Sequence, residues 1–108
     1  MSRDVRLQYT SYSPPNCVRS SRGVTGGQRA AAIAAAAGIP ISTHLYPEVA
    51  AHVIRVSETA HWLEWQDWAN PILQEPYEVM AGKLHIPDVP GVGLEWDEKA
   101  VAAHLADF

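Results

Sequence analysis

Small and apolar residues dominate one stretch of this chain that is long enough to form a helix. Residues 24–37 read VTGGQRAAAIAAAA, and Gly38 follows them. Alanine has the highest helix propensity of any residue, and a glycine just past a helix is a common C-terminal stop. The pattern predicts a helix over about residues 25–37. Its larger apolar side chains are Val24 and Ile33 alone, so this helix must pack closely on neighbouring elements to be stable.

Two short apolar runs follow, separated by a second helix-length segment. The segment begins at Pro47, whose fixed φ suits a first helical turn, and Glu48 favours the positive end of the helix dipole. Strands that read as continuous apolar runs are typical of parallel sheets buried on both faces. The sequence therefore predicts a βαβ unit with parallel, neighbouring strands, made of a strand at 39–43, a helix at 47–57 and a strand at 62–64.

The second helix carries an apolar stripe that we expect to face the core. Val49, Val53 and Val56 recur at helical spacing, and two further apolar residues, Ala50 and Ile54, widen the stripe. His52 lies beside it. A partly buried, hydrogen-bonded histidine without a functional role is the favoured interpretation of that residue.

The remaining parts of the chain have weaker patterns. Residues 1–22 show no clear helical or strand period and are predicted to be poorly ordered. After Pro71, prolines and glycines interrupt the chain repeatedly, and residues 77–79 and 84–86 are expected to form a hairpin around a turn at 81–83. Asp97 is expected to cap a last short helix over 98–105.

Composition and charge exclude several classes of function. The 108 residues include 8 Lys and Arg against 12 Asp and Glu, which gives no basic stripe for nucleic acid. The longest apolar run, Ala30–Ala37, is far shorter than the ~20 residues needed to cross a bilayer. The single cysteine, Cys17, cannot form an internal disulfide. We therefore expect a cytoplasmic, reduced protein with no nucleic-acid or membrane partner.

Two polar side chains occupy positions where active sites are commonly built. His44 follows the first predicted strand and Glu64 ends the second, and in parallel sheets the carboxyl ends of strands are the usual place for catalytic groups. Other interpretations remain open: His44 as a buried structural histidine, and Glu64 as a solvent-facing or helix-capping carboxylate. A zinc site of His44, Glu48 and His52 is disfavoured because Pro47 places His44 outside the helix and no HExxH motif is present.

An ordered set of motifs resembles the C-terminal part of the enolase superfamily, most closely the mandelate racemase and sugar-acid dehydratase branch. The motifs are GVTG at 23–26, STH at 42–44, WLE at 62–64 and PDVPGVG at 87–93. The resemblance runs from about residue 15 to residue 105. It implies an α/β fold that forms part of a (β/α)8 barrel. Residues 1–22 would be an N-terminal segment that does not follow the family pattern, and residues 23–70 would be the last βα units of the barrel. Residues 71–108 would be a C-terminal tail that in the family returns to the capping domain.

The resemblance also implies a chemistry. Enolase-superfamily enzymes remove a proton from the carbon next to a carboxylate, with Mg²⁺ stabilising the enediolate. It implies that His44 is the strand-end base and that Glu64 hydrogen-bonds the developing enolate oxygens. Asn16 stands where the family has the aspartate that pairs with the histidine. The family's magnesium carboxylates and opposing lysine lie on strands that this sequence does not contain, so Mg²⁺ is implied by the family without ligands in this chain.

Two functional hypotheses follow. In the first, the chain is a C-terminal fragment of a racemase or dehydratase for a small carboxylic or sugar acid, and it is inactive alone. In the second, it is a non-catalytic small α/β protein that binds a partner. Either form could associate as a homo-oligomer or through exposed sheet edges.

Overall fold

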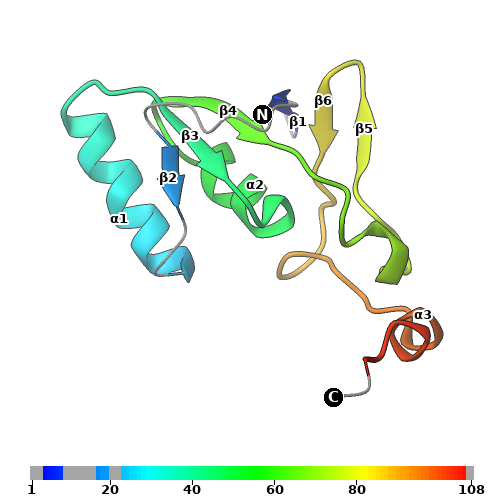
Figure 1. Ribbon diagram of the computed structural model, residues 1–108. Coiled ribbons are helices and arrows are strands. Elements are labelled where there is room, and N and C mark those ends of the chain that lie inside the picture. Colours follow the sequence, from blue (N-terminus) through cyan, green and yellow to red (C-terminus); the bar gives the residue numbers. More distant parts are fainter. Residues whose placement is uncertain (1–3, 9–16, 20–22, 107–108) are drawn as a thin grey trace.

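The computed structural model describes residues 4–8, 17–19 and 23–106 (Figure 1). These residues form a mixed α/β fold with one sheet, two helices packed against it and a C-terminal tail. The helices are α1 (Gly23–Ala36), α2 (Pro47–Arg55), the 3-10 turn η1 (Asn70–Ile72) and α3 (Glu98–Ala103). The strands are β1 (Asp4–Gln8), β2 (Cys17–Arg19), β3 (Ile41–His44), β4 (Ala60–Glu64), β5 (Glu78–Met80) and β6 (Lys83–His85).

The sheet has six strands in the order β2-β3-β4-β1-β6-β5. The first four are parallel to one another, whereas β6 and β5 run antiparallel to their neighbours. Helix α2 packs on β3, β4 and β1, and α1 packs on α2 and β2. No helix in the described part of the chain is long and apolar enough to cross a membrane.

The central βαβ unit confirms the sequence prediction, including the parallel pairing of its two strands. The first strand is shifted along the chain, to Ile41–His44 instead of 39–43. Pro40 has no backbone N–H to contribute to a sheet ladder, which accounts for a strand that starts after it. Helix α1 starts two residues earlier than predicted, at Gly23, and α2 ends two residues earlier, at Arg55.

The predicted apolar stripe of α2 is partly wrong. The buried positions of this helix are Pro47, Glu48, Ala50, Ala51 and Ile54. Val56 is 71% exposed because the helix has already ended and this residue is its C-cap. Val53 faces α1 instead, where a Cβ placed on Gly27 would lie 3.5 Å from the Val53 Cγ1. Small residues thus let the helices approach each other and the sheet.

The N-terminal part contains two strands that the sequence analysis did not predict. In β1, Val5 and Leu7 alternate with polar residues, which is a strand signal of period two. The strand pairs with β4 through Leu7 and Leu63 and with β6 through Val5 and Leu84. It therefore joins the parallel part of the sheet to the hairpin. The predicted disorder of residues 1–3, 9–16 and 20–22 concerns positions outside the described residues.

The core lies between the sheet and the helices. Its largest fully buried side chains are Ile54, Leu63, Leu84 and Ile86. They belong to one cluster that also contains Ala31 and Ala34 of α1, Ile41, Ala50, Ala51, Trp65 and Tyr77. Because Leu84 and Ile86 come from the tail, the hairpin shares its core with the βαβ unit.

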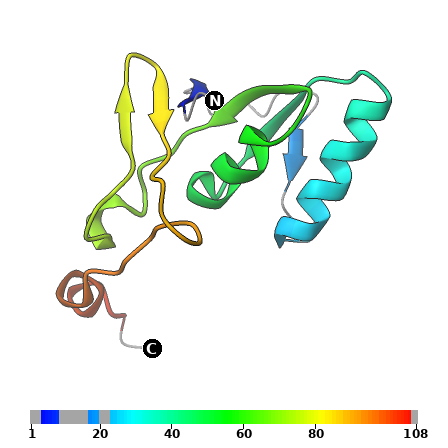
Figure 2. The same cartoon turned by 180° about the vertical axis from the view of Figure 1, so that it is seen from behind.

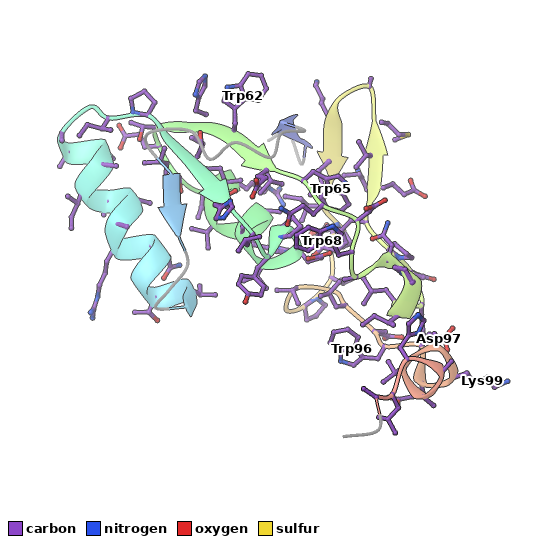
Figure 3. The ribbon with its side chains drawn as sticks, in the orientation of Figure 1. Trp62, Trp65, Trp68, Trp96, Asp97 and Lys99 are labelled. Atoms are coloured by element: carbon purple, nitrogen blue, oxygen red, sulfur yellow. The ribbon has the colours of Figure 1, made fainter. Side chains whose placement is uncertain are left out.

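The tail confirms the predicted hairpin and the predicted helix cap. Ala81 and Gly82 both have positive φ, 51° and 72°, as a type I′ hairpin turn requires. The Asp97 carboxylate, at the start of α3 (Figure 3), accepts hydrogen bonds from the amides of Lys99 and Ala100. Helix α3 ends at Ala103 instead of residue 105. It packs on η1 and lies at the opposite end of the molecule from α1, as both views show (Figures 1 and 2).

A buried tyrosine ties the tail to α2. The Tyr77 hydroxyl lies 2.8 Å from the His52 Nε2 and donates a hydrogen bond to the Val92 carbonyl. The predicted structural role of His52, as a hydrogen-bonded and partly buried residue, is confirmed. Burial, followed by the nearby charge of Glu48, raises the pKa of Tyr77 to about 12.

Removing this hydroxyl should destabilise the fold. We expect Tyr77→Phe to lower the free energy of unfolding by about 1–3 kcal/mol, because His52 and the Val92 carbonyl lose a buried partner. Urea unfolding followed by circular dichroism measures the change. Tyr46→Phe is the control, since Tyr46 is 69% exposed, and a Tyr77→Phe loss no larger than that of Tyr46→Phe would contradict the prediction.

The same tyrosine predicts a pH dependence. Its folded pKa of about 12 lies above the ordinary value of 10.0, so above pH 10 the unfolded chain loses this proton first. The contribution to stability is complete below pH 10 and is lost as the pH rises toward 12. The difference in unfolding free energy between wild type and Tyr77→Phe should therefore shrink over this range, and a constant difference would argue against the assignment.

Candidate active site

The fold brings His44 and Glu64 into direct contact. They end the neighbouring parallel strands β3 and β4, whose preceding residues, Thr43 and Leu63, are paired in the sheet. The His44 Nδ1 lies 2.6 Å from the Glu64 Oε2, and the two side chains are only 15% and 5% exposed. A histidine and a carboxylate at this distance form a strong, charge-assisted hydrogen bond. The two residues singled out from the sequence thus form one unit.

The backbone after His44 also contacts Glu64. The Leu45 amide donates a hydrogen bond of 3.0 Å to the same oxygen, Oε2. Leu45 and Tyr46 both have left-handed backbone conformations, with φ of 63° and 49°, which cost of order 1–3 kcal/mol each in residues other than glycine. This strained turn leads into Pro47 at the start of α2. It was not visible in the sequence, because nothing about the types Leu and Tyr indicates positive φ.

Two further residues lie at the same edge of the sheet. The register places Arg19 of β2 beside His44 and Gln8 of β1 beside Glu64. Neither residue was a predicted site residue, because β1 and β2 were not predicted as strands. Asn16, the candidate in the position of the family's aspartate, lies outside the described residues.

A small apolar cavity of about 230 Å³ adjoins this edge between α1, α2 and β3. Val24, Val49 and Val53 contribute apolar walls, and His44 and Thr43 line its sheet side. The Thr43 hydroxyl is buried, and no described residue forms a hydrogen bond with it. The volume is below the 300–1,000 Å³ usual for small-molecule pockets, so the cavity alone does not define a substrate site.

The described residues do not provide a magnesium site. Mg²⁺ binds oxygen ligands in near-octahedral geometry, commonly with one or two carboxylates. Within residues 4–8, 17–19 and 23–106, no three His, Cys, Asp or Glu side chains are grouped so that they could hold a metal. Glu64, the carboxylate that ends β4, already accepts hydrogen bonds from His44 and Leu45. His44 and His52 have different partners, Glu64 and Tyr77.

Comparisons with known proteins identify the family of this chain. The family model described as Enolase C-terminal domain-like matches residues 16–100. The chain belongs to this family. A curated relative, the L-talarate/galactarate dehydratase of Salmonella typhimurium, is 32% identical over 68 residues, covering 63% of this chain and 17% of the relative. The D-gluconate dehydratase of Thermoproteus tenax is 26% identical over 95 residues, covering 79% and 19%.

Solved structures of the superfamily share the fold of this chain. An enolase from alpha proteobacterium bal199 with bound Mg has a TM-score of 0.77 and 64% identity, covering 81% of this chain and 24% of the enolase. An enolase from Bradyrhizobium in complex with magnesium and mandelic acid has a TM-score of 0.70 and 49% identity, covering 75% and 22%. The chain thus spans less than a quarter of each of these proteins and matches the enolase C-terminal barrel portion.

Proposed function

We propose that this chain contributes the base of an enolase-superfamily active site that removes a proton from the carbon next to a carboxylate. The observation that carries the proposal is the contact between the His44 Nδ1 and the Glu64 Oε2 at two adjacent strand ends. Imidazole suits the role because it titrates near neutrality. With Nδ1 engaged by Glu64, the Nε2 of His44 is the atom that would accept the substrate proton.

The proposed substrate is a 2-hydroxy carboxylic or sugar acid. The names of the two dehydratases contain L-talarate, galactarate and D-gluconate. The Bradyrhizobium enolase is in complex with mandelic acid. All of them carry a hydrogen on the carbon next to a carboxylate, which is the bond that a strand-end base would break. Racemisation and loss of a β-hydroxyl are the two fates of the resulting carbanion that this family membership favours.

Proton removal also needs stabilisation of the enediolate that forms. Preorganised donors or cations next to the developing charge supply this stabilisation in enzymes, and the solved relatives named above bind Mg. The described residues of this chain do not fit such a site, because Glu64 is engaged and no further carboxylates are grouped with it. We therefore propose that residues 1–108 alone carry the base but do not catalyse the reaction.

Residues 1–108 should accordingly show no exchange of a substrate α-proton above background. The purified chain is incubated in deuterated buffer with mandelate, galactarate, L-talarate or D-gluconate, with and without Mg²⁺, and the α-proton signal is followed by NMR. The acids incubated without protein give the background. Exchange above that background that disappears in His44→Asn would show that this chain is catalytic by itself.

A further inference from the structure

The carboxylate that contacts His44 is Glu64, at the end of the adjacent strand. Its Oε2 lies 2.6 Å from the imidazole Nδ1 and accepts the Leu45 amide at 3.0 Å. The family resemblance instead assigns the histidine's partner to the position of Asn16 and gives Glu64 to the enolate oxygens. An asparagine amide is neutral and cannot stabilise imidazolium by charge as a carboxylate does.

Ordinary acid strengths indicate which atom carries the proton shared by the Glu64 Oε2 and the His44 Nδ1. The Leu45 N–H can only donate, so Oε2 is an acceptor toward it. A carboxylic acid is ordinarily a stronger acid than an imidazolium, so the proton between Oε2 and Nδ1 belongs on Nδ1. The neutral imidazole then has an unprotonated Nε2. This is the tautomer that a base needs in order to accept a proton at Nε2.

We infer that Glu64 is the positioning residue of His44: it holds the imidazole in the tautomer protonated on Nδ1, in place of the carboxylate that Asn16 does not provide. The strained turn at Leu45 and Tyr46 supports this role, because it directs the Leu45 amide to the same oxygen and so fixes the carboxylate. The catalytic meaning of the inference rests on the proposed function, whereas the tautomer can be measured without any reaction.

Nitrogen-15 NMR of the histidine rings in the whole chain tests the inference directly. At about pH 9, above the usual range of imidazole titration, we expect His44 to be protonated on Nδ1. In Glu64→Ala, His44 should change to the tautomer protonated on Nε2, which free histidine favours. Glu58→Ala is the matched control: it removes an exposed carboxylate that precedes β4 and should leave the His44 shifts unchanged.

The same spectra report whether each variant is folded. The His52 ring is bonded to the Tyr77 hydroxyl, so unchanged His52 shifts indicate native packing. If Glu64→Ala loses those shifts, Glu64→Gln decides instead: it keeps the shape without the charge, and we expect a lower fraction of the Nδ1 tautomer. The inference is overturned if His44 keeps its tautomer in the folded Glu64 variant, or if Glu58→Ala changes that tautomer as much as the Glu64 variant does.

The two proposals fail in different ways. A wild-type His44 already protonated on Nε2 would refute the positioning role of Glu64 and leave α-proton abstraction to be judged by exchange. A correct tautomer without exchange, in a protein with all its other active-site groups, would refute the proposed function and leave the positioning role intact.

Discussion

Replacing His44 by asparagine should reduce α-proton exchange by about 10²–10⁴-fold in an enolase that carries residues 16–100 of this chain. The bal199 enolase is a suitable recipient, because it is 64% identical to this chain and has a TM-score of 0.77. The graft replaces the matching segment, so the rest of the enolase remains unchanged. The substrate is an acid for which the parent enolase shows exchange, and the rate of deuterium incorporation is followed by NMR.

The expected loss has a specific cause. Asparagine occupies a volume similar to that of histidine but has no atom that accepts a proton near neutral pH, so general-base catalysis is removed. His52→Asn is the control, since the His52 ring bonds Tyr77, whereas the ring that bonds Glu64 is that of His44. We expect that variant to stay within about tenfold of the unmutated graft. Equal rates in the graft and in its His44→Asn form would exclude His44 as the base.

The central βαβ unit was predictable because several local signals agree. Alanine propensity and Gly38 define α1, Pro47 and Glu48 define the start of α2, and apolar runs define β3 and β4. Buried parallel strands joined by one helix leave few alternatives for how they pair. The predictions for these elements therefore differ from the structure only by short shifts at their ends.

The missed elements depend on contacts that are distant in the sequence. β2 is only three residues long and forms by pairing with β3. β1 carries an alternating pattern, but its place between β4 and β6 follows from pairing with residues more than fifty positions later. Val56 was assigned to the core because α2 was expected to continue to residue 57, and the earlier helix end leaves it exposed.

The candidate site was predictable in position but not in its hydrogen bonds. His44 and Glu64 could each be identified from their positions at predicted strand ends. The parallel pairing of the two strands makes them neighbours. Their direct contact depends on the sheet register and on the left-handed conformations of Leu45 and Tyr46. Such conformations are imposed by the surrounding fold and have no signature in these residue types.

Truncating Leu63, a fully buried residue of the sheet, should remove most of the stability of the chain. Leu63 of β4 is 0% exposed and lies between β3 and β1. We expect Leu63→Ala to lower the free energy of unfolding by about 2–5 kcal/mol, from lost apolar burial and the cavity left behind. Urea unfolding monitored by circular dichroism measures the loss. Ile33→Ala is the control, because Ile33 is 71% exposed on α1, and it should change stability by less than about 1 kcal/mol.

The effect of Leu63→Ala on folding should be large, because we expect residues 1–108 alone to have a small free energy of unfolding. β2 and β5 are the edges of the described sheet, and unpaired edges of this kind promote association between chains. We therefore predict that the isolated wild-type chain unfolds over a broad range or self-associates, which thermal unfolding and analytical ultracentrifugation would detect. A wild-type monomer with sharp, cooperative thermal unfolding would contradict this expectation. A Leu63→Ala variant as stable as Ile33→Ala would contradict the prediction for Leu63. It would mean that the buried contacts of Leu63 are not what holds β3, β4 and β1 together.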